Sequence, residues 1–308
     1  MINNIRYKDH EEWLSLRRDY IGGSEAGAIV GMNPYKSAYS LWAEKTGKIP
    51  EFEGNITTKV GAYLEDLVAK MFEEETGKKV KRHNAIMVND KYPFAEANVD
   101  RLIVGEKSLL EIKTTNSLPT MKKIHGGEFP DAWYAQVTHY LAVTELEKAY
   151  LAVLVNCREF QIFELDRDED EINSLMNAEK EFWNHVKTNT PPSVDGTDST
   201  TDTISELYPE SDDNEVSLMA YESDLRQYLD FSNQIKSLKS LQDEIGNRIK
   251  SFMQNSGKGN SNNFKVSWTS SVRNTFDSKA FVADHPSEDL SKYYKSTNVR
   301  TFKVTERK

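Results

Sequence analysis

Residues 98–113 of this 308-residue chain read NVDRLIVGEKSLLEIK. Two segments rich in branched apolar residues meet at Gly105-Glu106, which predicts a β-hairpin whose two-residue turn begins with glycine. A turn at this position places Asp100 directly opposite Glu111, with β-carbons about 4.5 to 5.5 Å apart, and like charges so placed destabilise a sheet. Lys113 shares a strand face with Glu111 because side chains alternate along a strand. The stretch therefore predicts an acidic pair that needs a compensating cation.

Two interpretations of this acidic pair are open. Charged groups on a strand face are usually solvated, and Asp100, Glu111 and Lys113 can form such a surface cluster. Glu111, however, lies within the apolar run LLEI of residues 109–112, where an isolated charge is costly unless it is paired or coordinated. Hard divalent cations such as Mg²⁺ prefer carboxylate oxygens, so the second interpretation is a metal site.

Composition limits the possible classes of protein. The chain has one cysteine, Cys157, which excludes an internal disulfide and a cysteine cluster for zinc or iron–sulfur, and a reducing cytoplasm is expected. No signal peptide or membrane-spanning run is expected from the apolar pattern. The net charge of −10 counts against a protein that coats DNA by long-range attraction, but it allows a locally basic groove or a ring around DNA.

A glycine-rich segment near the N-terminus predicts an anion site. Arg17 lies in a predicted helix over residues 10–20, which leads into IGGSEAGAIVG at residues 21–31. Ser24 is a suitable N-cap, and the free N–H groups at a helix start attract phosphate. The alternative is a tight capped turn whose glycines serve packing, and the nearby Arg17 favours the phosphate.

Two further predicted helices carry candidate polar residues. In the helix over residues 57–76, Glu65 lies at the edge of the apolar stripe, one turn after Gly61, so it either reaches into a cleft or stays on the surface. Gln136 and Tyr140 are four residues apart and share one face of a later helix. Gln136 is either a surface residue or a buried amide that needs polar partners, and a hydrated metal could supply one.

The order of elements predicts an α/β protein with a mixed sheet between helices. This domain is expected over residues 1–192. An acidic polar linker is expected over residues 193–214. Residues 215–308 are expected to form a long amphipathic helix, over residues 218–252, followed by a small α+β tail.

Six motifs follow one another between residues 12 and 155: Trp13…Arg17, Ile21-Gly22-Gly23-Ser24, Gly61…Glu65, Asn98-Val99-Asp100, Leu110-Glu111-Ile112-Lys113 and Gln136…Tyr140. Together they resemble the YqaJ-like viral recombinases, relatives of phage lambda exonuclease within the PD-(D/E)XK nuclease superfamily. The resemblance implies a restriction-endonuclease-like core.

The resemblance also implies roles for these residues. Asp100, Glu111, the Ile112 carbonyl and Glu65 would bind two Mg²⁺ ions, for which Mn²⁺ could substitute. Lys113 and Gln136 would position the attacking water or the phosphate, while Arg17, Ser24 and Tyr140 would hold the 5′-phosphate end of DNA. Asn98 stands where the phage enzyme has a second phosphate-binding serine.

The implied activity is processive 5′ to 3′ digestion of linear double-stranded DNA by a ring-shaped homotrimer, which leaves a 3′ single strand for an annealing recombinase. The implied setting is the cytoplasm of a bacterial host, with a phage or prophage origin and no membrane attachment. Two alternatives remain: an endonuclease or repair nuclease of the same superfamily, and a non-catalytic recombination scaffold. The intact set of Asp100, Glu111 and Lys113 argues against a scaffold.

Overall fold

The computed structural model describes residues 1–285, 289–295 and 299–306. The chain forms two compact units, Met1–Tyr208 and Pro209–Lys308. Among the described residues, no helix has both the length and the apolar character needed to cross a membrane.

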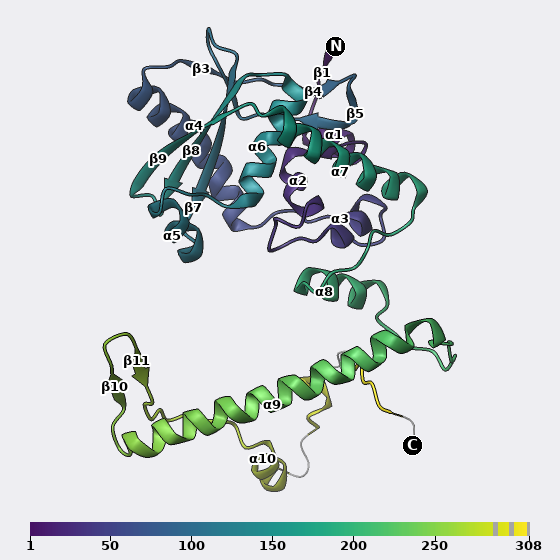
Figure 1. Ribbon diagram of the computed structural model, residues 1–308, viewed down its shortest axis with the longest axis vertical. Coiled ribbons are helices and arrows are strands. Elements are labelled where there is room, and N and C mark those ends of the chain that lie inside the picture. The colour runs from purple at the N-terminus through teal and green to yellow at the C-terminus, as the bar shows by residue number, and fades with distance from the viewer. Residues whose placement is uncertain (286–288, 296–298, 307–308) are drawn as a thin grey trace. The chain divides into compact units, whose positions relative to one another are not determined.

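A five-stranded mixed sheet forms the centre of the first unit (Figure 1). Its order is β3-β6-β7-β8-β9, in which β7 and β8 are parallel and the other neighbours are antiparallel. The β6–β7 ladder pairs Arg101 with Leu110 and Leu102 with Leu109, which is the predicted hairpin register. The strands are β3 Val80–Lys81, β6 Arg101–Ile103, β7 Ser108–Thr115, β8 Lys148–Val155 and β9 Glu159–Asp166.

A second sheet has four short strands in the order β1-β4-β5-β2, with β2 and β5 parallel. These strands are β1 Ile2–Ile5, β2 Ile21–Gly22, β4 Ile86–Asn89 and β5 Tyr92–Ala97. The apolar pattern of residues 80–88 by itself predicts one strand. The structure instead divides this segment between β3 and β4, which belong to different sheets.

Helices cover both faces of the central sheet. Helix α4 (Ile56–Thr76) packs its buried Val68 and Phe72 against Leu110 and Ile112 of β7. Helix α6 (Asp131–Thr144) is buried from Ala135 to Thr144 and contacts both sheets. The remaining helices of this unit are α1 His10–Arg18, α2 Gly23–Ile29, α3 Ala38–Lys45, α5 Leu118–His125, α7 Glu169–Thr188 and α8 Asp198–Leu207. The predicted α/β class with a mixed sheet between helices is confirmed.

Three details differ from the sequence prediction. The hairpin connection spans residues 104–107, with Gly105 at a φ of +84°, rather than two residues. The residues after Lys113 are rich in Thr, Ser and Gly, which predicts a polar loop, but the structure continues β7 to Thr115 and then forms α5. Within the expected linker, α8 buries Thr200, whose hydroxyl donates a hydrogen bond of 2.8 Å to the Ser37 hydroxyl, so the unit boundary falls at residue 208.

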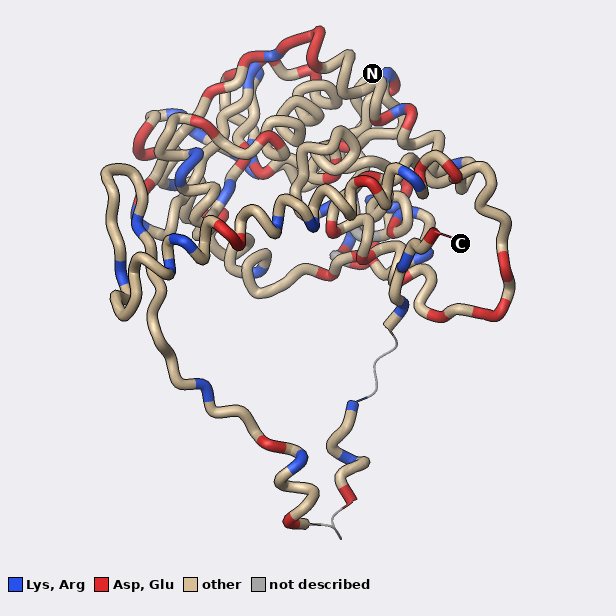
Figure 2. The backbone as a smooth tube through the Cα atoms, turned by 60° about the horizontal axis from the view of Figure 1, so that its bottom comes forward, with Lys and Arg blue, Asp and Glu red and all other residues tan. Residues whose placement is uncertain are grey.

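The second unit is built on the long helix α9 (Glu222–Met253), as the amphipathic pattern predicted. Its other elements are the short 3₁₀ helices Met219–Tyr221 and Ser291–Tyr293, strands β10 Lys258–Asn260 and β11 Lys265–Ser267, and helix α10 Ser278–Asp284. Asp277 caps α10, and residues 300–304 form no strand, although their apolar and polar side chains alternate as in one. Across both units, Lys and Arg residues are scattered among Asp and Glu residues (Figure 2).

Candidate active site

The predicted acidic pair lies beside the start of β6. Asp100 directly precedes β6, and its Oδ2 accepts a hydrogen bond of 2.7 Å from the backbone N–H of Ile112. Burial raises the pKa of Asp100 well above its usual value, and the negative charges of Glu111 and Glu65 raise it further. The carboxylates are therefore close enough to repel one another in a poorly solvated place.

Glu111 is the centre of a compact polar cluster. Its side chain is buried, and Oε1 lies 2.8 Å from the Lys113 ammonium and accepts a hydrogen bond of 2.8 Å from the Gln136 amide. The Lys113 ammonium also donates to Gln136 Oε1 at 2.8 Å, and the Gln136 amide donates to the Tyr140 hydroxyl at 3.1 Å. Residues from β7 and α6, far apart in sequence, are thus brought together. Of the two alternatives for Gln136, the structure shows a buried amide with polar partners and not a surface side chain.

Glu65 approaches from α4 but faces a different partner. It forms an ion pair with the buried guanidinium of Arg101, which also contacts Asp66 at 2.6 Å. Sequence reasoning missed Arg101. Its position next to Asp100 was a partial signal, because consecutive residues of a strand face opposite sides and Arg101 therefore points away from Glu111. The sequence did not specify which helix covers that face.

The donors of this cluster fit a hard divalent cation. Glu111 Oε2 is buried and has no hydrogen-bond partner in the described part of the chain, so a carboxylate oxygen is left for a ligand, and Asp100 supplies a second carboxylate. Among the described residues, no three Asp, Glu, His or Cys side chains are grouped so that they could hold a metal ion together. Two carboxylates with water and substrate phosphate match the usual environment of Mg²⁺, and Glu65 would join only by leaving Arg101.

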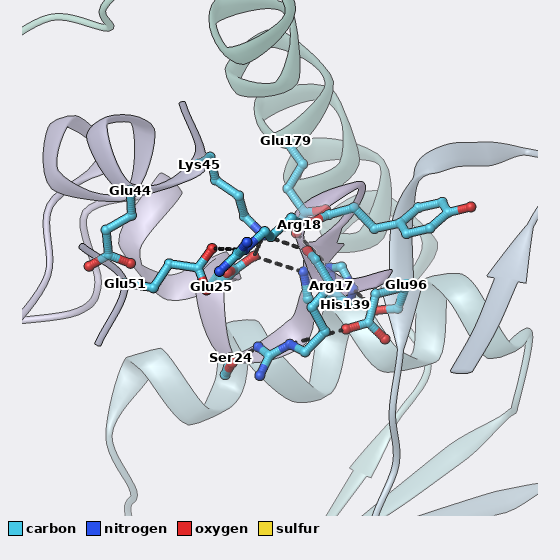
Figure 3. Close-up of polar contacts among 12 residues, drawn as sticks. Arg17, Arg18, Ser24, Glu25, Glu44, Lys45, Glu51, Glu96, His139 and Glu179 are labelled. Carbon is cyan, nitrogen blue, oxygen red and sulfur yellow. Dashed lines mark hydrogen bonds and ion pairs between the residues drawn. The ribbon is translucent and has the colours of Figure 1, made fainter. Parts of the chain in front are cut away.

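Arg17 and Ser24 form a second cluster, as predicted (Figure 3). The Arg17 guanidinium donates to the Ser24 hydroxyl at 3.1 Å, lies over the Trp13 ring at 4.7 Å and is 3.7 Å from the buried carboxylate of Glu96. A cavity of about 190 Å³ opens beside them. Its lining comprises Arg17, Arg18, Ser24, Glu25, Lys36, Glu44, Lys45, Glu51 and Phe52.

The basic side chains of this cavity differ in how fully they are neutralised. Three have close acidic partners: Arg18 with Glu51 at 2.8 Å, Lys36 with Glu44 at 2.5 Å and Lys45 with Glu25 at 2.9 Å. Lys45 also donates to the backbone carbonyls of Arg17 and Tyr20, so its hydrogen-bonding capacity is used. Arg17, with its acid at 3.7 Å, is the lining cation with the most distant acidic partner.

Two adjacent glycines connect the Arg17 cluster with the Glu111 cluster. A β-carbon on Gly22 would lie 2.8 Å from Glu96 Oε1, and one on Gly23 would lie 2.4 Å from the Tyr140 ring. The glycines thus allow β2 and α2 to approach both clusters. Tyr140 is buried here and does not line the Arg17 cavity, so the prediction that it contacts the phosphate has no direct support.

Buried His139 and Glu179 form a pair next to the backbone of Glu96 (Figure 3). His139 Nε2 lies 2.7 Å from the Glu96 carbonyl oxygen, and Nδ1 lies 2.8 Å from the Glu179 carboxyl group. Because a carbonyl only accepts, Nε2 carries a hydrogen, and one further proton is shared between Nδ1 and Glu179. Burial raises the pKa of Glu179, which favours retention of that proton.

Comparison with known proteins places this arrangement in a family. Residues 12–147 match the YqaJ-like viral recombinase domain family. The uncharacterized protein YqaJ of Bacillus subtilis is 38% identical over 302 residues, which cover 96% of this chain and 94% of that protein. Among solved structures, the alkaline exonuclease LHK-Exo of Laribacter hongkongensis superimposes with a TM-score of 0.52 at 19% identity, over 58% of this chain and 94% of that enzyme. Its complex with dAMP gives a TM-score of 0.51 at 18% identity. The first unit therefore has the fold of an exonuclease, and the chain belongs to the YqaJ-like viral recombinase family.

Proposed function

We propose that this chain is a Mg²⁺-dependent deoxyribonuclease that digests linear double-stranded DNA from 5′ ends. The observation that carries the proposal is the buried Glu111 carboxylate. One of its oxygens has no partner within residues 1–285, 289–295 and 299–306, while Lys113 and Gln136 bind the other. A buried and unpaired carboxylate oxygen is costly, and it becomes favourable when a divalent cation binds there. Bound Mg²⁺ would lower the pKa of a water molecule and stabilise negative charge on the scissile phosphate.

Lys113 and Gln136 have separate roles in this proposal. The Lys113 ammonium is held between Glu111 and Gln136 at 2.8 Å from each, which fixes a positive charge beside the acidic pair. That charge stabilises the phosphate oxygens as they become more negative. Gln136 orients Glu111 and Lys113 together, and Tyr140 holds the Gln136 amide in place.

The Arg17 cavity suggests how DNA ends are recognised. Arg17 has the most distant acidic partner of the lining cations, and its planar guanidinium is suited to paired hydrogen bonds with phosphate. Ser24 adds a hydroxyl at 3.1 Å from this guanidinium. Since only an end carries a terminal phosphate, such a pocket favours exonucleolytic over internal cleavage.

The family resemblance supports the remaining parts of the proposal. It implies ring-shaped trimers that supply 3′ single strands to an annealing recombinase, so the same assembly and partner are proposed here. An internal endonuclease is the second candidate because the acidic cluster alone would also serve that reaction.

The test uses three DNA substrates with Mg²⁺ and an Asp100→Ala control. Linear duplex with 5′-phosphate ends should be digested much faster than duplex with 5′-hydroxyl ends, and closed circular DNA should remain intact. Equal rates on both linear substrates would remove the phosphate pocket from the proposal. Cleavage of the circle would establish the endonuclease, and full activity of Asp100→Ala would reject the metal site.

A further inference from the structure

A second cavity lies outside both clusters, between helix α7 and the start of β5. Its volume is about 530 Å³, which is within the range of sites that hold a nucleotide-sized ligand. Helix α7 contacts β5 here (Figure 1). The lining consists of Lys91, Tyr92, Pro93, Phe94, Asn173, Met176, Asn177, Lys180, Trp183 and Lys187.

The lining of this cavity is basic, and Glu169, which lies outside the lining, acts on Lys91 alone among its lysines as far as the described residues show. Three of its ten lining residues are lysines and none is acidic, although Asp and Glu outnumber Lys and Arg in the chain by 49 to 39. Lys180 and Lys187 are exposed, and neither forms an ion pair with a described residue. The Arg17 cavity, in contrast, places three acids among its four basic residues. A concave surface with three lysines and no acid attracts anions.

Aromatic side chains form the rest of the surface. Tyr92 and Phe94 are buried, and Trp183 is partly exposed on the same face of α7 as Lys180 and Lys187. Lysines beside an accessible indole are the combination that binds single-stranded nucleic acid, in which the backbone meets the cations and an unpaired base stacks on the ring.

We propose that the cavity formed by Lys91, Lys180, Trp183 and Lys187 binds single-stranded DNA. The observations favour a single strand over a duplex because only an unpaired base has a free face for Trp183. An acidic peptide would use the same lysines, but it would not require the flat face of an indole. The site would hold a single-stranded part of the substrate or product away from the catalytic cluster, and it exists whether or not the proposed cleavage polarity is correct.

The experiment measures binding of a fluorescently labelled oligothymidylate by anisotropy in EDTA, across a series of salt concentrations. EDTA prevents cleavage, so binding is read independently of catalysis. Lys180→Gln/Lys187→Gln should reduce the slope of log K against log salt by about 1.4, because each lost phosphate contact on a single strand removes about 0.7. At about 0.1 M salt, this change corresponds to roughly 10- to 30-fold weaker binding.

The matched control is Lys107→Gln/Lys148→Gln, which removes the same charge from lysines paired with Glu147 and Glu164. Trp183→Leu should weaken binding by roughly tenfold, whereas Trp183→Phe should retain most of it because a stacking face remains. Lys180→Arg/Lys187→Arg keeps both positive charges, so it should show the same slope of log K against log salt as the wild type. Thermal melting of each variant verifies that it is folded.

Three results would overturn the proposal. One is a salt slope for Lys180→Gln/Lys187→Gln equal to that of the control pair. Another is equal binding by Trp183→Leu and Trp183→Phe. The third is a Lys180→Gln/Lys187→Gln variant that binds oligothymidylate as well as the wild type but no longer binds an oligoglutamate peptide. That result would assign the cavity to an acidic protein partner.

Discussion

Replacing Asp100 with asparagine should stabilise the metal-free protein while abolishing its activity. The asparagine side chain would retain an oxygen that accepts from the Ile112 N–H, but it would lack the charge that faces Glu111. Two unit charges about 5 Å apart at an effective dielectric constant of 20 repel by roughly 3 kcal/mol. Since the positive charge of Lys113 offsets part of this repulsion, the expected gain is about 1 to 2 kcal/mol.

The sign of the pH dependence follows from the same pKa. A carboxyl group whose pKa is higher in the folded state binds more protons there, so folding stability is lost as pH rises through that folded value. Wild-type protein in EDTA should therefore lose stability as pH rises above the ordinary aspartate value of about 3.9, and Asp100→Asn should reduce this dependence. Mg²⁺ competes with the proton, so its stabilising effect on the wild type should grow as pH rises.

The assay is thermal melting in EDTA and in Mg²⁺ at several pH values. For a unit of this size, the expected gain for Asp100→Asn corresponds to roughly 3 to 6 °C in EDTA, with no further shift on addition of Mg²⁺. Asp166→Asn is the control, because Asp166 is 83% exposed and lies on β9 away from Glu111. A lower melting temperature of Asp100→Asn in EDTA, or a retained Mg²⁺ shift, would refute the electrostatic account.

Three further variants test the packing and the chemistry. Lys113→Ala should lower kcat by roughly 100- to 1000-fold in a Mg²⁺-dependent digestion assay, because one stabiliser of the transition state is lost, and near-normal turnover would contradict this role. Gly23→Ala should lower the midpoint of urea unfolding, since the new β-carbon would lie 2.4 Å from the Tyr140 ring. Gly196→Ala is the control, because a β-carbon there meets no atom within 4 Å. Equal midpoints for the two variants would show that α2 shifts freely. Glu179→Leu should lower the free energy of unfolding in urea by about 3 kcal/mol, because His139 loses a buried hydrogen bond. Glu179→Gln should lower it less, because an amide can still bond to the imidazole ring. A larger loss for Glu179→Gln would indicate that the pair needs its charge.

Local periodicity predicted the hairpin because its information lies within sixteen consecutive residues. The alternation of apolar side chains determined which residues share a face, and the glycine determined where the chain reverses. The observed pairing of Arg101 with Leu110 has the predicted register, even though the connection is longer than two residues. Register is well specified here because a slip by one residue would move every buried side chain of β7 to the wrong face.

The features missed by the sequence analysis depend on contacts between distant segments. Strand β2 has two residues and exists only because β5 pairs with it, so no periodicity could reveal it. The polar segment before Tyr208 resembles a linker, but Thr200 becomes buried when Ser37 offers a hydrogen bond. The pairing of Glu65 with Arg101 likewise requires α4 to lie across β6, which the order of elements alone does not specify.

An acidic chain can bind DNA when its cations act at short range. At physiological salt, charges more than about 8 Å apart are largely screened, so the net charge of −10 weakens long-range attraction more than it weakens contacts inside a cavity. Arg17 retains capacity for an anion because its acidic partner is at 3.7 Å, and Lys180 and Lys187 have no acidic partner among the described residues. The chain should therefore bind DNA slowly but hold it at the Arg17 cavity and at the cavity of Lys180 and Lys187. Neutralising Lys180 and Lys187 should accelerate dissociation of an oligothymidylate more than it slows association. Stopped-flow measurements separate the two rates. If the loss of affinity came mainly from slower association, long-range attraction would operate despite the net charge.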